Sequence, residues 1–265
     1  MTIFWKKCRD RKYNLLWWVV GITAYMLMMG WYYPSISEQK EAMEALLESF
    51  PDTMWTILGL DGTIDMMSGS GFLTVEAFSI MLPICFSIFA MGIGSRSIAG
   101  EETDGTLEIL AAMPVSRGQI FIENFLALLV LMATLGACLW VSVLIASRWG
   151  DMGITYLPIS GGTLMVSLLG LFFGTLTLTA GAITGRRGQT IAIGTAAIVV
   201  AYALNTLAKT ITSLSVIRWL SPFHYYTEGL SLNQNLQFTD ALPLIIGISA
   251  LAWIGFYIFK HRDIK

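Results

Sequence analysis

The stretch NLLWWVVGITAYMLMMGWYY, residues 14–33, carries no charged side chain. Because a helix of roughly 20 apolar residues crosses the hydrocarbon core of a bilayer, this stretch predicts a membrane span. Aromatic residues prefer the two membrane–water interfaces, and here Trp17 and Trp18 stand near one end and Trp31 and Tyr32 near the other. The run is too long for the core of a secretory signal, and no small-residue cleavage site follows it. We therefore expect an uncleaved signal anchor.

The composition of the whole chain is that of a membrane protein. Of its 265 residues, 55% are hydrophobic and 13% are charged, and the mean hydropathy is +0.66. Soluble domains contain about 25% charged residues, so a soluble globular protein and a disordered one are both excluded. The formal net charge of −2 excludes a polycationic nucleic-acid binder. Three scattered cysteines argue against a disulfide framework and a cysteine-based zinc site.

Five further apolar stretches have the length of a span, at residues 72–95, 120–146, 161–184, 190–208 and 241–259. With the N-terminus placed in the cytoplasm, twelve basic residues fall in inner segments and four in outer ones, which favours both termini in the cytoplasm. Residues 2–12 hold five of these basic residues and predict either a short helix at the membrane interface or a solvated cluster that sets the topology. The sequence thus predicts an all-α integral membrane protein with six transmembrane helices.

Two longer segments, residues 34–71 and 209–240, then lie outside the membrane. The first repeats glutamate at helical spacing, which predicts an amphipathic helix whose acidic face is either merely solvated or attracts cations or basic substrates. The second is too apolar for a free loop, so we expect it to sit in the interface or to dip back into the protein. His224 within it is expected to be a structural hydrogen-bonding residue rather than a metal ligand.

The inner segment RSIAGEETDGTLEILAAMPVSRGQ, residues 96–119, is polar and contains several residues that typically start or end helices. Asp104 has the position of an N-cap for a short helix over residues 105–112. Ser116 and Gln119 have capping-box spacing for the next span. Since nothing near it in the sequence covers the apolar stripe of this short helix, we expect it to dock on a partner. The stripe consists of Leu107, Leu110 and Ala111.

The sequence IAGEETDGTLEILAAMPVSR, residues 98–117, resembles the ABC-2 type permease family, the membrane subunits of ATP-driven exporters. The resemblance covers essentially the whole chain, with Ser-Pro-Phe at 221–223 before the last span and Arg-Asp-Ile at 262–264. It implies a type V ABC exporter-like transmembrane domain, in which two six-span units face each other, as a homodimer or with a paralogue. Each unit would rest on a separate ATPase subunit. One departure is the N-terminal segment, which is shorter than in many members of the family.

The chain contains no G-x-x-x-x-G-K-[ST] phosphate loop. ATP and Mg would therefore be bound by the partner ATPase, while this chain would hold no cofactor or metal and catalyse no reaction. By resemblance, the segment 101–117 is a coupling helix that receives the movement of the ATPase. Arg186 and Arg187 would form a second contact, unless they serve only as positive-inside anchors. The residues assigned to coupling are Glu101, Glu102, Gly105, Thr106, Leu107, Glu108, Leu110, Pro114, Arg117, Arg186 and Arg187.

Small residues recur along one side of the fourth span, within about 100° of arc on an ideal helix. Such residues let helix backbones approach closely, and their hydroxyls can bond across the contact. The stripe predicts a packing seam inside one subunit or, alternatively, a wall of the translocation path or a moving dimer seam. Its members are Thr163, Ser167, Gly170, Gly174, Thr177 and Gly181.

The residues within the spans separate three classes of function. The absence of an Asp/Glu/His relay from the sequence of the spans disfavours an ion-gradient-driven carrier, and the absence of a recognisable catalytic set disfavours a membrane enzyme. The fourteen methionines suggest copper only weakly, because methionine is ordinary filler in apolar helices. A permease that extrudes Na⁺ or copper ions stays an alternative. We expect an exporter in the plasma membrane of a bacterium or archaeon, surrounded by membrane lipid. It would move an amphipathic or hydrophobic substrate outward and bind no nucleic acid.

Overall fold

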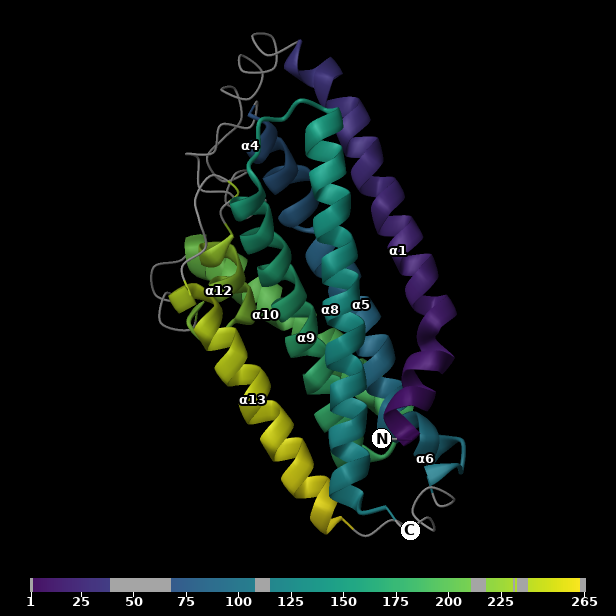
Figure 1. Ribbon diagram of the computed structural model, residues 1–265. Helices are drawn as coiled ribbons and strands as arrows, with labels where there is room; N and C mark the ends of the chain where they lie inside the picture. Colours follow the sequence, from purple (N-terminus) through teal and green to yellow (C-terminus); the bar gives the residue numbers. More distant parts are fainter. Residues whose placement is uncertain are drawn as a thin grey trace.

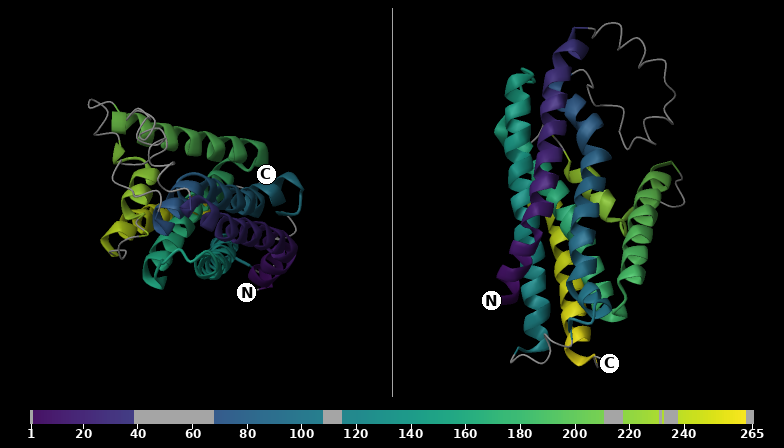
Figure 2. Two further views of the ribbon diagram at one scale, coloured as in Figure 1. Left: turned by 90° about the horizontal axis from the view of Figure 1, so that it is seen from above. Right: turned by 90° about the vertical axis from the view of Figure 1, so that its right-hand side faces the viewer.

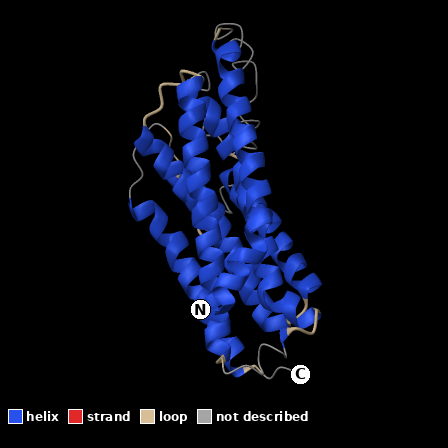
Figure 3. Ribbon diagram, turned by 45° about the vertical axis from the view of Figure 1, so that its right-hand side comes forward, coloured by secondary structure: helices blue, strands red, loops and turns tan. Residues whose placement is uncertain are grey.

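The computed structural model describes residues 2–38, 68–107, 115–210, 218–230, 232 and 238–262. Within these residues every regular element is a helix, as the colours of Figure 3 show. The short elements η1 and η2 are π-helical. The elements are α1 (Thr2–Ser37), α4 (Gly69–Leu73), η1 (Thr74–Phe78), α5 (Met81–Ser95), η2 (Arg96–Gly100), α6 (Glu101–Thr103), α8 (Arg117–Trp149), α9 (Tyr156–Thr184), α10 (Arg187–Thr210), α12 (Pro222–Gly229) and α13 (Phe238–His261).

Six helical segments of the described chain are long and apolar enough to cross a membrane, which confirms the predicted number of spans. Each predicted stretch lies inside one of these segments, and the second segment runs from α4 through α5 to α6. The helices form an elongated bundle (Figures 1 and 2). The start of α1 and the end of α13 lie at the same end of it, at the bottom of Figure 1. We call this the termini end.

α1 runs without a break through residues 2–12, where a separate interfacial helix or a solvated cluster was expected. Its 36 residues give a length of about 54 Å at 1.5 Å per residue, which exceeds the hydrocarbon core of about 30 Å. It packs along α8, where the hydroxyls of Thr23 and Ser142 share a hydrogen bond of 2.9 Å. The surplus length carries the basic residues of α1 to the termini end.

α9 is the central helix and contacts α5, α8, α10 and α13. Glycines make the closest of these contacts. A Cβ added to Gly170 would lie 2.7 Å from Cε of Met132, and one added to Gly174 would lie 2.8 Å from Cβ of Ala90. Gly181 lies in a similar way against η2. At these positions the neighbouring helices leave no room for a larger residue.

The hydroxyl side chains of the same stripe bond within their own helix. Thr163, Ser167 and Thr177 each donate to the carbonyl oxygen four residues earlier, at 2.8, 2.7 and 3.1 Å. The stripe is therefore covered by other helices of the same chain, in the arrangement of a packing seam inside one subunit. Leu169, which the helical projection places on the opposite side of α9, is also fully buried, because helices surround α9.

The outward faces of the bundle are apolar. Exposed large side chains include Trp17 on α1, Val199 and Val200 on α10, and Ile246 and Trp253 on α13. A water-soluble protein rarely exposes apolar patches of this extent. Helices, whose backbone hydrogen bonds are satisfied internally, can present such faces to lipid.

The described residues 218–230 of the second outer segment pack into the protein through the buried residues of α12, as the apolar composition predicts. Ser221 caps the start of α12 by accepting a hydrogen bond of 3.2 Å from the Phe223 amide. The buried Tyr226 hydroxyl donates to the carbonyl oxygen of Phe78, and burial raises the pKa of this phenol well above its usual range. The His224 ring lies 4.9 Å from that of Trp219, and its Nδ1 lies 3.4 Å from Oε1 of Glu228. Its predicted role as a structural hydrogen-bonding residue stays a prediction.

Two predictions about the outside of the molecule stay predictions. Glu41, Glu44 and Glu48, which would form the acidic helix of the first outer segment, lie outside the described residues. The assignment of the termini end to the cytoplasm rests on the count of basic residues.

Candidate functional site

The segment predicted to couple the chain to a partner continues directly from a membrane span. α5, η2 and α6 follow one another without an intervening loop, and α6 lies near the termini end (Figure 1). Ser97, Ile98 and Ala99 are buried in η2, which packs against α9. π-helical turns inserted in α-helices are frequent at functional sites.

α6 ends at a left-handed glycine. Gly105 has φ +70°, its N–H donates to the Glu102 carbonyl at 3.2 Å, and the Thr106 N–H donates to the Glu101 carbonyl at 2.8 Å. These two bonds form a Schellman motif, which closes a helix. Asp104 precedes the glycine with helical dihedrals, φ −83° and ψ −1°. The prediction that Asp104 begins a helix at residue 105 is therefore wrong, since this Asp-Gly pair ends the preceding one.

Glu101, the first acidic residue of α6, binds α1. Lys7 donates from Nζ to Oε1 of Glu101 at 2.5 Å and to the carbonyl oxygen of Ser97 at 3.3 Å. The side chains of Lys7 and Glu101 are only 12% and 14% exposed. Two residues separated by 94 positions thus tie the first turns of α1 to α6.

Glu102, the second acidic residue, binds the segment that follows α13. Arg262 donates to both carboxylate oxygens of Glu102, at 2.6 and 2.9 Å, in a bidentate pair. The same guanidinium donates to the carbonyl of Ala182 in the last turn of α9, at 3.2 Å. Gly185 ends α9 with φ +63°, and a Cβ there would collide with both charged groups. Glycine is thus required at this position by conformation and by space.

Leu107 lies inside a second hydrophobic cluster at the termini end and is 1% exposed. The prediction that it offers an apolar face to a partner is wrong, because residues distant in the sequence cover it. Glu108, Leu110 and Pro114 lie outside the described residues. The cluster consists of Ile3, Ile98, Leu107, Ile120, Phe121, Leu178, Ala182 and Phe259.

The segment rejoins the bundle at the start of α8. Ser116 accepts a hydrogen bond of 3.2 Å from the Gln119 amide, in the N-cap role that the spacing predicts. The Gln119 side chain donates to Glu123 at 2.9 Å, and the other oxygen of Glu123 accepts from the backbone of α1 at 3.0 Å. Arg117 donates to the backbone carbonyl of Arg262. The beginning of α8 is thus held to α1 and to the segment after α13.

The two arginines of the predicted second contact have different surroundings. Arg186 is exposed, whereas Arg187 is partly buried and donates its backbone N–H to the hydroxyl of Thr103 at 3.4 Å. Thr103, Asp104, Gly105 and Thr106 are exposed as well. The surface that a partner can reach here therefore comprises residues 103–106, which we call the exposed turn, together with Arg186.

Sequence reasoning did not find Lys7, Arg262 and Glu123 as part of this site. Each forms a contact that joins segments far apart in the sequence. The sequence did indicate that ion pairs form here, because Glu101 and Glu102 are an acidic pair in an inner segment otherwise flanked by basic residues. The sequence could not identify which basic residues pair with them, since the chain has many basic residues on that side.

Comparison with known proteins identifies a family for the whole chain. A family model described as ABC-2 family transporter protein matches residues 1–264, a range that contains all six spans, the exposed turn and both ion pairs. No curated protein matches the chain. Six apolar helices and a match over nearly the full length give one conclusion: the chain belongs to the ABC-2 family of transporter proteins and is its multi-pass membrane component.

Proposed function

We propose that this chain is the permease subunit of an ATP-driven exporter and moves an amphipathic or hydrophobic substrate outward. A separate ABC ATPase subunit would bind at the termini end and supply the energy. A second permease copy, identical or paralogous, would complete the pathway. The observation that carries this proposal is the exposed turn, which is solvent-accessible yet fastened to four membrane helices.

The connections of the exposed turn suit the transmission of force. It continues into α5 through α6 and η2, and Glu101 connects it to α1 through Lys7. Glu102 connects it to α9 and to the end of α13 through Arg262. A displacement of a few ångströms imposed by a partner would therefore reach several spans together. Short contacts of this kind carry coupling only if the helices have two discrete arrangements, which ATP binding and hydrolysis would select.

The lack of a phosphate loop in the sequence supports a separate source of ATP hydrolysis. The count of basic residues supports a cytoplasmic position for the exposed turn, where an ATPase subunit would find ATP. The outward direction follows the resemblance to exporters.

The exposed turn provides a direct test. The chain is expressed with the ABC ATPase of its native host and purified, and the retained ATPase and substrate-stimulated hydrolysis are measured. Arg186→Glu and Asp104→Lys should each lower ATPase retention and coupled hydrolysis several-fold, since both change exposed charges at the proposed contact. Arg148→Glu is the matched control, because Arg148 is an exposed arginine in the last turn of α8, far from the exposed turn.

Two outcomes would contradict the proposal. One is full retention of the ATPase by Arg186→Glu and Asp104→Lys, which would place the contact elsewhere. The other is transport in ATP-free vesicles driven by a proton or sodium gradient, which would assign the chain to the carriers instead.

A further inference from the structure

A cavity of about 520 Å³ lies between α1, α5 and α10 near the termini end. Three arginines from three different elements line it: Arg11 of α1, Arg96 of η2 and Arg187 of α10. Asp10 is the one acidic residue on the described lining. The cavity is therefore a concentration of positive charge within a largely apolar bundle.

The arginine charges of this cavity are only partly compensated within the described part of the chain. The charges of Arg96 and Arg187 act repulsively on that of Arg11, whereas those of Asp10 and Glu101 act attractively on it and more weakly. None of the three forms an ion pair with a described carboxylate, and the nearby Glu101 and Glu102 are engaged by Lys7 and Arg262. Like charges gathered in a partly dehydrated site are unfavourable unless an anion joins them.

Two buried polar atoms on the same lining also lack a hydrogen-bond partner among the described residues. They are Nε of Arg187 and the hydroxyl oxygen of Ser95, and Ser95 is fully buried. Buried polar groups of native proteins nearly always have a partner in the protein or in a bound molecule. A ligand with several acceptor oxygens would satisfy both atoms and neutralise the arginines. A phosphate group has this chemistry.

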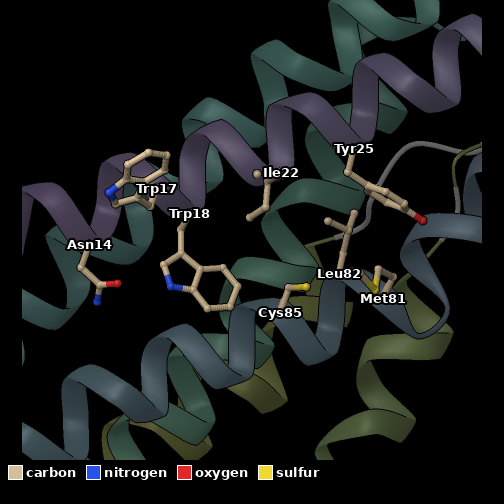
Figure 4. Close-up of a pocket in the computed structure, with 9 residues that line it drawn as sticks. Asn14, Trp17, Trp18, Ile22, Tyr25, Met81, Leu82 and Cys85 are labelled. Atoms are coloured by element: carbon tan, nitrogen blue, oxygen red, sulfur yellow. The ribbon is translucent and has the colours of Figure 1, made fainter.

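A second cavity, of about 370 Å³, continues from the first between α1 and α5. The two share Asn14 and Trp18 on their linings. Figure 4 shows Trp18 and Ile22 of α1 extending toward Leu82 and Cys85 of α5. The second cavity is lined mainly by apolar and aromatic side chains and contains no charged residue on its described lining. The two cavities are adjacent, and we call them together the groove, which is basic at the termini end and apolar beyond it.

The groove has the length of a lipid chain. From Arg11 to Tyr25, which lines its far part, α1 rises about 21 Å. One leaflet contributes about 15 Å to a hydrocarbon core of about 30 Å. Gly21 and Gly92 line the groove, and a Cβ added to either would meet no atom within 4 Å, so the floor of the groove is open there.

We propose that this groove binds an anionic phospholipid. The phosphate would lie among Arg11, Arg96, Arg187 and Ser95, and one acyl chain would run along α1 and α5 past Trp18. Basic pockets between transmembrane helices on the cytoplasmic side are known to bind anionic lipid headgroups. The inference is independent of the ATPase partner, so its failure would leave the proposed function standing.

Photolabelling in nanodiscs tests the proposal without ATP or an ATPase. The full chain is placed in phosphatidylcholine containing a minor fraction of phosphatidylglycerol with a photoreactive acyl chain, and labelled peptides are mapped. A parallel sample contains photoreactive phosphatidylcholine. Phosphatidylglycerol should label residues 15–25 and 81–89 several-fold more strongly, and added inorganic phosphate should not displace it.

Two independent variants probe the two ends of the groove. Arg11→Gln combined with Arg96→Gln should lower the labelling by phosphatidylglycerol to the level of phosphatidylcholine, whereas Arg9→Gln, an exposed arginine off the groove, should leave it unchanged. Gly21→Leu fills the open floor and should lower the labelling several-fold, whereas Ala24→Leu, an exposed site on the same helix, should not. Monodisperse elution of each variant establishes that it is folded, and either variant alone decides the test.

Three results would overturn the proposal. Equal labelling by the two lipids, or unchanged labelling in either folded variant, would show no selective site. Displacement by inorganic phosphate would identify a site for a free anion. Oxidative cross-linking of a Gly92→Cys variant into dimers would show that a second copy of the chain covers the groove.

Discussion

Along α9, neighbouring helices meet through glycine and alanine, whereas at the termini end the same helices are joined by long charged side chains. The α9 seam leaves 2.8 Å between Ala90 and a Cβ placed on Gly174. At the other site, Lys7 and Arg262 reach across to Glu101 and Glu102. Close backbone contact fixes helix spacing, because any added atom must displace a helix. Charged pairs of flexible side chains tolerate small shifts of the helices that carry them, so the termini end is suited to movement and the seam to rigidity.

The largest effect is expected where the seam is closest. Gly174→Leu should prevent folding or assembly, because the new side chain would overlap Ala90 and Leu128. Overpacking a core by a few methylene groups costs roughly 1–3 kcal/mol, and here two helices would have to separate. The yield of monodisperse protein in detergent is the measurement. Leu164→Phe, on an exposed position of α9, is the control and should elute normally. Normal yield of Gly174→Leu would show that the seam is not rigid.

The next effect is expected for Leu107, which belongs to the cluster of the termini end. Leu107→Ala should lower the free energy of unfolding by about 2–5 kcal/mol, as is usual for a fully buried leucine. The loss should appear in the isolated chain, with no ATPase present. Thr106→Ala, at the exposed neighbouring position, should change stability little. If Leu107→Ala unfolds like the unmodified protein yet releases the ATPase, the leucine acts at a partner interface after all.

A smaller effect is expected for the bidentate pair. Arg262→Gln should cost about 1–2 kcal/mol, because it removes charge-assisted bonds to Glu102 and to a carbonyl of α9 from groups about one-fifth exposed. A double-mutant cycle with Glu102→Gln measures the coupling between the two side chains. Additive losses would mean that the pair does not tie α6 to the end of α13.

The smallest effect is expected for Lys7. Lys7→Gln should cost about 1 kcal/mol, because one ammonium group binds a single carboxylate oxygen and a carbonyl. The loss should decrease at high salt, whereas that of Leu107→Ala should not. Lys6→Gln, an exposed neighbour, is the control. If Lys7→Gln lowered the free energy of unfolding by more than Arg262→Gln does, the Lys7–Glu101 pair would be the stronger of the two.

The six spans could be predicted because each is a long apolar run, whose length and composition are local properties of the sequence. The small-residue side of α9 could be predicted as well, since helical periodicity projects it directly. Its neighbours could not, because Gly174 meets residues of α5 and α8 that no periodicity identifies.

At the candidate site, the local sequence led to a wrong helix boundary at Gly105 and gave no indication of the residues that cover Leu107. An aspartate followed by glycine fits both the start and the end of a helix, and the backbone hydrogen bonds around Gly105 decide for the end. Leu107 was assigned to a docking face because nothing near it in the sequence could cover it. The residues that do cover it, such as Ile3 and Phe259, lie near the two ends of the chain.

Arg262 has one more consequence, which concerns the order of synthesis. The carbonyl of Ala182 and the carboxylate of Glu102 both receive hydrogen bonds from this residue, yet a ribosome adds it only after all six spans. Until then, the end of α9 lacks this donor, and the second acidic side chain of α6 lacks its counterion. A nascent chain halted before Arg262 would therefore expose an unpaired carboxylate at the surface proposed for the ATPase.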